Sequence, residues 1–194
     1  LRGFGIFIAC LALGVMTIAA VASASRGLTE GLAREGRRIL GGDAAFSLIH
    51  REASPAELSF LTARGTVSSI ATMRGMANAG EKGAALIEIK AVDASYPSIG
   101  TVETDPQAPL PGLLDQRDGA YGAVADPVLF GRLDLKPGDI VTVGGAKIQL
   151  RANLVSEPDK IAAGVGFGPR LLMSQEALKA TGLKTKREAV ELGL

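Results

Sequence analysis

The residues that could do chemistry are few. The chain has one histidine, His50, and one cysteine, Cys10. A Ser-His-Asp relay would need His50 as its base, while a zinc site or an intramolecular disulfide needs more His or Cys than the chain holds. No G-x-S-x-G elbow is present, and His50 ends an expected strand beside Arg51 and Glu52. We therefore expect a solvated strand-end histidine, no catalytic residue and no metal site; a hydrolase built on His50 is the minor alternative.

Two other patterns could suggest ligand binding. Residues 164–168 read G-V-G-F-G, but no Lys-Ser/Thr follows and the loop precedes an expected strand, whereas a nucleotide fingerprint opens a helix. We expect a flexible loop and no cofactor-binding residue. A charged group falls on one expected strand and its turn, where alternation would make it a solvated face: Glu81, Lys82, Glu88, Lys90 and Asp93. Cys10 lies in an apolar stretch, where a buried thiol is the default and lipidation the minor option.

Composition sets the class of protein. Of 194 residues, 47% are hydrophobic, 21% charged and 4% aromatic, with no Trp, so a packed core of Ala, Val, Leu and Ile is expected. Lys and Arg number 21 against 20 Asp and Glu, a net charge of +1. That balance lacks the basic excess of a nucleic-acid binder, so no nucleic-acid partner is expected.

The N-terminal segment carries no charge from residue 3 to residue 25. As a helix it would be roughly 35 Å long, enough for a hydrocarbon core of about 30 Å. We expect residues 1–25 to be a transmembrane helix in contact with membrane lipids, and residues 26–42 to continue it as a stalk helix. The alternative is a cleaved signal peptide, because Ala22-Ser23-Ala24 fits the small-x-small rule for cleavage.

Residues 43–182 are expected to form one α+β domain with mixed or antiparallel sheets. Alternation and turn signals predict strands and helix caps. Ser54-Pro55-Ala56-Glu57 is a capping box, Asp126-Pro127 and Ser174 are further N-caps, and Gly144-Gly145 is a hairpin turn. Four prolines between 93 and 116 predict a surface connection. The expected strands are 44–50, 66–76, 85–92, 140–143, 147–150 and 170–173.

Several stretches together resemble the YbbP-like permeases of the MacB/FtsX-type ABC transporters, over about residues 1 to 182. They are the opening L-R-G-F-G-I-F-I-A-C-L-A-L-G-V, then Leu40-Gly41-Gly42-Asp43, Lys90-Ala91-Val92-Asp93 with Tyr96-Pro97, Leu135-Lys136-Pro137-Gly138-Asp139, and G-F-G-P-R-L-L-M-S at 166–174. The resemblance implies a first transmembrane helix, a stalk and a periplasmic core domain of porter-like fold, in the bacterial inner membrane.

The resemblance also implies partners. The chain has no G-x-x-x-x-G-K-[ST] loop, so a separate ABC ATPase subunit and further transmembrane helices of the same permease are expected. Such a permease couples ATP hydrolysis in the cytoplasm to motion of the periplasmic domain, and the YbbP-like branch is associated with export of a lipid- or lysophospholipase-related substrate. We expect this chain to be a non-enzymatic part of that system; the alternative is a secreted or membrane-anchored periplasmic binding module without an ATPase partner.

The last residues depart from the permease pattern. Residues 180–194 resemble the helical part of VapB-type antitoxins, and the simpler expectation is a terminal helix that bears Lys and Arg. We therefore set residues 183–194 apart as a divergent C-terminal tail, native or the product of a frameshift or fusion.

Overall fold

The computed structural model describes residues 2–40, 44–49, 51, 53–158, 168–183 and 187–193. The chain divides into two units, residues 1–36 and 37–194, which are described separately. The first unit lies in one helix, α1 (Arg2–Leu40), unbroken over 39 residues. Within α1, Phe4–Leu28 is long and apolar enough to cross a membrane, with a mean hydropathy of 2.5. Helix α1 continues beyond residue 25 without a break as far as Leu40.

The second unit is built on a mixed ten-stranded sheet. Its strands run in the order β1-β10-β2-β3-β9-β6-β8-β4, with β5 paired to β6, and β7 paired to β2 and β8. The pairs β3–β9 and β6–β8 are parallel and the others antiparallel. The bounds are β1 Ala44–Ile49, β2 Thr66–Asn78, β3 Ala84–Val92, β4 Glu103–Asp105, β5 Gln116–Arg117, β6 Ala120–Ala125, β7 Ile140–Val143, β8 Ala146–Ser156, β9 Arg170–Ser174 and β10 Arg187–Gly193.

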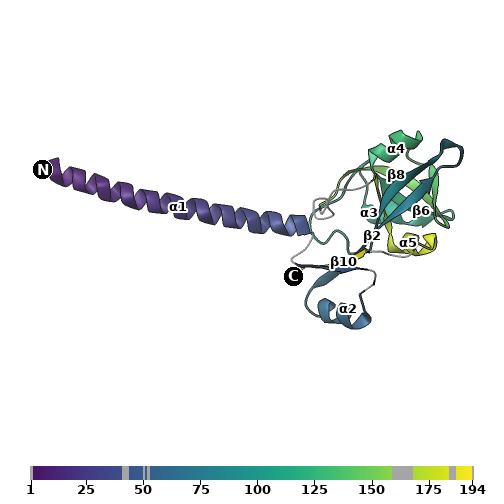
Figure 1. Cartoon of the computed structure of the whole chain (residues 1–194), viewed down its shortest axis with the longest axis horizontal. Coiled ribbons are helices and arrows are strands. Elements are labelled where there is room, and N and C mark those ends of the chain that lie inside the picture. Colours follow the sequence, from purple (N-terminus) through teal and green to yellow (C-terminus); the bar gives the residue numbers. More distant parts are fainter. Residues whose placement is uncertain are drawn as a thin grey trace. The chain divides into compact units, whose positions relative to one another are not determined.

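Local sequence explains where the short helices start. In α2 (Pro55–Thr62), Ser54 and Glu57 form the predicted capping box. Asp126 caps α4 (Pro127–Leu133) by accepting from the N–H of Val128, and Ser174 caps α5 (Gln175–Thr181) in the same way from Ala177. The remaining helical segments are α3 (Leu110–Leu114) and the 3-10 turn η1 (Gly80–Lys82). In Figure 1, α4 is drawn above and α5 below the labelled strands β6 and β8, and both helices contribute residues to the same hydrophobic core.

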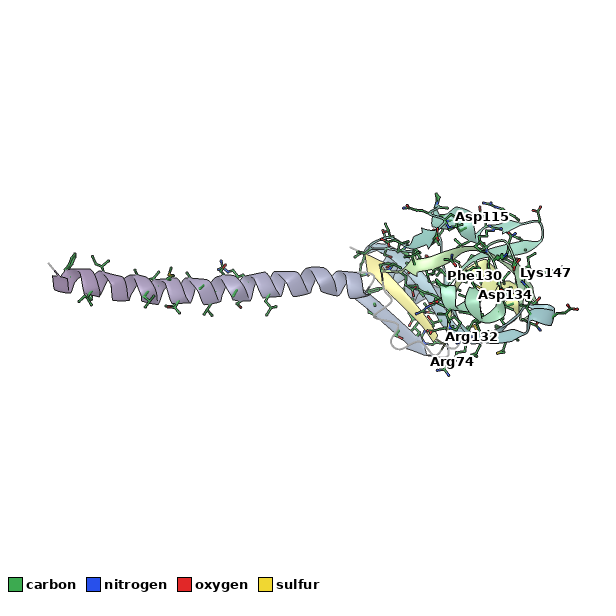
Figure 2. The ribbon with its side chains drawn as sticks, turned by 90° about the horizontal axis from the view of Figure 1, so that it is seen from above. Arg74, Asp115, Phe130, Arg132, Asp134 and Lys147 are labelled. Atoms are coloured by element: carbon green, nitrogen blue, oxygen red, sulfur yellow. The ribbon has the colours of Figure 1, made fainter. Side chains whose placement is uncertain are left out.

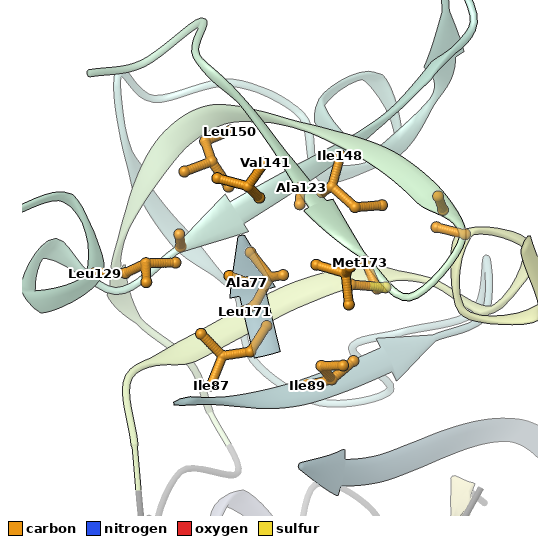
Figure 3. Packing of buried hydrophobic residues seen from close by; sticks show 14 of the residues in the cluster. Ala77, Ile87, Ile89, Ala123, Leu129, Val141, Ile148, Leu150, Leu171 and Met173 are labelled. Atoms are coloured by element: carbon orange, nitrogen blue, oxygen red, sulfur yellow. The ribbon is translucent and has the colours of Figure 1, made fainter. Parts of the chain in front are cut away.

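Two hydrophobic cores lie on the two faces of the sheet. The first core contains Ile87 and Ile89 of β3, Ile148 of β8 and Met173 of β9, all with no exposed surface. Figure 3 shows these side chains pointing into one interior, together with Leu129 of α4 and Val141 of β7. The second core gathers apolar residues from the opposite face and from the connection after β3: Ile70, Val92, Tyr96, Leu113, Leu114, Val124, Ala152, Leu154 and Leu172.

The predicted α+β class with a mixed sheet is confirmed, and three local expectations need correction. Strand β6 was not predicted because its residues are nearly all buried, so neither face shows polar alternation. The 93–116 connection contains β4 and α3, and Leu113 and Leu114 of α3 are buried in the second core, so it is more than a surface loop.

The expectation of a C-terminal helix is wrong. Residues 187–193 form β10, which inserts between β1 and β2 and pairs with both in antiparallel register. Val190, opposite Phe46 and Ser69 in these pairings, is only 1% exposed. The backbone hydrogen bonds of two neighbouring strands and the burial of Val190 outweigh the helix propensity that Lys, Glu and Leu give this stretch.

Candidate functional site

The residues considered for chemistry do not form one site. His50 and residues 164–167 lie outside the described part of the chain. Cys10 lies within α1, inside the apolar segment Phe4–Leu28. Among the described residues, no group of three or more His, Cys, Asp or Glu is arranged to hold a metal ion. A buried network of ion pairs lies on the face of the sheet that carries the second hydrophobic core, and it is described next.

Four charged side chains form this network. Lys90 on β3 places its Nζ 3.0 Å from Oε2 of Glu157 and donates to the hydroxyl of Tyr96 at 2.8 Å. Arg170 on β9 places Nε 3.2 Å from Oε1 of Glu157 and NH1 3.4 Å from Oε1 of Glu88. The side chains of Lys90 and Glu157 are only 2% and 1% exposed. Each carboxylate in these pairs thus lies against a cation in a largely buried place, as buried charges require.

The burial of Lys90 corrects a sequence expectation. Glu88 and Lys90 were expected on a solvated face because they alternate with Ile87, Ile89 and Ala91. Those three apolar residues do lie in the first core, fully buried. The other face of β3 is covered as well, since Val92 packs in the second core and Glu157 reaches Lys90. Alternation distinguishes the two faces of a strand, but it does not show that the polar face meets water.

The other charged residues of that group behave differently. Lys82 is exposed and bridges to the turn before β7, donating to the carbonyl of Asp134 at 2.7 Å and to Asp139 at 3.3 Å. A hydrogen bond from the backbone N–H of Lys136 and then one from Lys82 lower the pKa of Asp139. Glu81 is exposed. For Glu81 and Lys82 the solvated-face expectation is confirmed.

Asp93 fixes the start of the connection that carries Tyr96. Its Oδ1 accepts from the hydroxyl of Ser68 and from the N–H of Ser95, both at 3.0 Å, and its Oδ2 accepts from the N–H of Ser69 at 2.6 Å. Gln175 donates from Nε2 to the carbonyl of Ser69 at 2.9 Å. These bonds join the C-terminal end of β3 to β2 and to the start of α5.

A cavity of about 290 Å³ opens beside this connection. Its apolar wall comes from the second core and α3, and its polar rim from the ends of β3, β5 and α5. Asp115, labelled in Figure 2, stands on this rim. The lining residues are Val92, Asp93, Ala94, Tyr96, Leu110, Pro111, Leu114, Asp115, Gln116, Ser174, Gln175, Glu176 and Lys179.

The geometry of the buried ion network indicates a structural role, joining strands of the sheet, and not a catalytic one. In the ion network each carboxylate faces a guanidinium or an ammonium group, an arrangement that neutralises charge and does not activate a nucleophile.

A separate, exposed ion pair lies at the start of α2, where Arg51 donates two 2.8 Å hydrogen bonds to Glu57. The bond from Arg51, and then those from the backbone and hydroxyl of Ser54, lower the pKa of Glu57 to about 2.

Comparison with known proteins gives a match over most of the chain. The chain is 32% identical over 173 residues to a protein of Escherichia coli (strain K12) named as an uncharacterized ABC transporter permease, YbbP. The match covers 89% of this chain and 20% of that permease, so the chain spans about one fifth of the relative's length. This chain is similar to a YbbP permease. The resemblance inferred from the sequence motifs is thereby confirmed, although no protein-family model matches the chain.

Two solved structures are also similar in shape. One is the extracellular domain of the noncanonic ABC-type transporter YknZ from Gram-positive bacteria, 14% identical, with a TM-score of 0.48; the likeness covers 77% of this chain and 83% of that domain. The other is the periplasmic region of MacB from Actinobacillus actinomycetemcomitans, 11% identical, with a TM-score of 0.49, covering 81% and 77% of the two chains.

The motifs that carry the likeness to YbbP-like permeases meet in the fold. Lys90, Asp93 and Tyr96 come from one motif, and Arg170 from another 74 residues further along the chain. Lys90 and Arg170 both contact Glu157, Tyr96 contacts Lys90, and Asp93 holds the intervening turn. Sequence reasoning missed Glu157, which lies just past the end of β8 in a stretch without a recognised motif. The buried partner of a charged residue gives no signal in a single sequence.

Proposed function

We propose that the chain is the N-terminal part of an ABC transporter permease, with a membrane-anchored domain on the outer side of the membrane. The observation that supports this is the extent of the match to YbbP. The match leaves about 21 of the 194 residues unaligned. Because α1 alone has 39 residues, the aligned region must include part of α1 as well as the domain.

The proposed organisation follows the helix and the sheet. Residues 1–25 span the membrane and residues 26–42 form a stalk. The extracytoplasmic core domain, predicted over residues 43–182, also includes β10, so the segment set apart as a divergent tail at 183–194 contributes a strand to the sheet of the domain. The continuity of α1 supports a stalk, because the helix runs on without a break from Leu28 to Leu40. That extension is about 18 Å of rigid helix. A continuous helix is suited to transmit movement between the membrane and the domain.

The proposed partners belong to a transport system. A separate P-loop ATPase would act through parts of the permease beyond this chain, with further transmembrane helices around α1 and membrane lipids at its surface. The proposed location is the bacterial inner membrane, with the domain in the periplasm, and the proposed cargo is a lipid- or lysophospholipase-related substrate. In this proposal the chain couples motion and catalyses no reaction itself.

Fractionation of the expressed chain separates this proposal from the alternative of a released binding module. The permease proposal predicts that the chain stays in the membrane after carbonate extraction and that its N-terminal sequence still includes Phe4–Leu28. A soluble periplasmic product beginning at Ser25, after cleavage behind Ala24, would overturn the anchor and favour the binding module.

The ATPase partner needs a separate experiment on the full-length permease. Affinity purification from detergent-solubilised membranes should recover a P-loop ATPase in constant stoichiometry, and the complex should hydrolyse ATP. A matched control is the same purification with this chain alone, which the proposal expects to recover no ATPase. A full-length permease that purifies without any ATPase would contradict the proposed coupling.

A further inference from the structure

We infer that the cavity between α3 and α5 binds a small amphiphilic amine, an ammonium group carried on a short apolar tail. The inference concerns the folded domain and goes beyond the proposed function, whose outcome does not decide it. It rests on the apolar wall of the cavity, on the sign of the charges at its rim, and on a carboxylate there that is held by neutral donors.

The cavity lies where two parallel strands end. Val92 and Ser174 are the last residues of β3 and β9, they are register partners, and both line the cavity. The crevice outside the carboxyl ends of parallel strands is a common place for ligands in α/β sheets. The volume of about 290 Å³ is at the lower end of small-molecule sites, which span about 300–1,000 Å³. The space therefore fits a small ligand.

The wall of the cavity is apolar and rigid. It is formed by Val92 of β3 and by Leu110, Pro111 and Leu114 of α3. Val92 and Leu114 are only 2% and 7% exposed and pack in the second core, which holds the wall in place. A ligand with an apolar tail gains affinity by covering this surface, whereas a bare ion does not.

The charges at the rim favour a cation. Three lining residues carry carboxylates, Asp93, Asp115 and Glu176, and one carries an ammonium group, Lys179. Glu176 is exposed, and among the described residues its side chain makes no hydrogen bond or ion pair. Asp115 is also exposed and lies 3.7 Å from Arg117 in a surface ion pair. Both carboxylates can therefore turn towards a cation in the cavity.

The third carboxylate is fixed in place by neutral groups. Asp93 is half-buried and accepts hydrogen bonds from the hydroxyl of Ser68 and from the backbone N–H groups of Ser69 and Ser95. These donors orient the carboxylate but do not neutralise its charge. An ammonium group in the cavity would supply the opposite charge that a partly buried carboxylate favours.

The same features distinguish an amine from other cationic ligands. Among the residues that the structure describes, no group of His, Cys, Asp or Glu could hold a metal ion, which disfavours a metal cation. A phospholipid with an amino headgroup would bring its phosphate against the carboxylates of the rim. A free amine with a short apolar tail matches both the wall and the rim.

The test is titration of the full chain in detergent with isoamylamine, followed by NMR of isotope-labelled valine and leucine methyl groups. The methyl signals of Val92 and Leu114 should shift along one saturable curve. We expect a dissociation constant on the order of 1 mM for a ligand of this size. Isovalerate has the same tail and the opposite charge, so it should bind at least about ten-fold more weakly.

Variants at the rim test the role of charge. Glu176→Gln and Asp115→Asn, both at exposed positions, should each weaken binding of isoamylamine by up to about five-fold, the range of exposed ion pairs. Lys179→Gln removes the ammonium group of the rim and should tighten binding by a similar factor. Glu81→Gln, at an exposed glutamate outside the cavity, is the matched control and should leave the dissociation constant unchanged.

A blocking variant tests the place of binding. Ala94 lines the cavity and is exposed, so Ala94→Trp should fill the space, abolish the methyl shifts and leave the thermal unfolding midpoint unchanged. Three results would each overturn the inference: no shift at ten times the expected dissociation constant, equal shifts with isoamylamine and isovalerate, or binding to Ala94→Trp that equals binding to the unsubstituted chain.

Discussion

The ion pair between Lys90 and Glu157 gives the most quantitative prediction. Substituting Lys90→Met keeps a long apolar side chain but removes the ammonium group 3.0 Å from Glu157. At that separation two unit charges attract by about 5.5 kcal/mol at an effective dielectric constant of 20. Among the contacts of the described residues, the carboxylate would keep the one with Arg170, and the hydroxyl of Tyr96 would lose the hydrogen bond from Lys90. Breaking one side of a buried pair costs about 3–5 kcal/mol, which we expect here.

A double-mutant cycle isolates this interaction. The variants Lys90→Met, Glu157→Gln and the pair together are compared by urea unfolding of the full chain in detergent, followed by far-ultraviolet circular dichroism. The double variant leaves Arg170 with Glu88, a neutral pair, so it should lose about 2–4 kcal/mol less than the sum of the single variants. A coupling below about 0.5 kcal/mol, the range of independent sites, would refute the proposed burial of the pair.

Three further predictions address other parts of the chain. A Cβ at Gly122 would run into the backbone carbonyl of Leu113, so Gly122→Ala should lower the free energy of unfolding by about 3 kcal/mol in the same urea assay. The carboxyl of Glu57, whose pKa is lowered to about 2, should titrate near that pH by NMR, and Arg51→Ala should move its titration midpoint up towards 4.5. The stability that the Arg51–Glu57 ion pair gives the fold is complete above the pKa of Glu57 in the unfolded chain and is lost as the pH falls through about 2. Leu13→Arg should reduce membrane insertion by about 2.5–3.5 kcal/mol, measured as membrane yield.

Each of these predictions has a result that contradicts it. At Gly131 in α4 an added Cβ meets nothing within 4 Å, so Gly131→Ala should not destabilise the fold; equal losses at Gly122 and Gly131 would argue against the packing around Gly122. A titration midpoint of Glu57 that is unchanged by Arg51→Ala would contradict the Arg51–Glu57 ion pair. Normal membrane yield of Leu13→Arg would count against a spanning α1.

Local chemistry made much of the fold predictable. The capping box at Ser54, the N-caps at Asp126 and Ser174, and the glycine turn at Gly144 each depend on residues within a few positions of one another. The apolar run of α1 needs only its length and composition. Interactions of this range can be read from one sequence because both partners lie in the same short segment.

The parts that escaped prediction depend on distant partners. Strand β6 is recognisable only once β8 and β9 flank it, and β10 becomes a strand through its pairing with β1 and β2. Lys90 is buried because Glu157, 67 residues away, reaches it. The sequence motif that contains Lys90 was recognisable, but its role in the fold depended on contacts that no single segment shows.

Side-directed labelling tests the central proposal of an extracytoplasmic, anchored permease domain most directly. Lys147 is exposed at the surface of the domain (Figure 2), and replacing Cys10 with Ser removes the only native thiol of this chain. In intact cells that express Cys10→Ser/Lys147→Cys, a membrane-impermeant maleimide should label the membrane fraction without lysis. Labelling that appears only after the inner membrane is opened would place the domain in the cytoplasm and contradict the account.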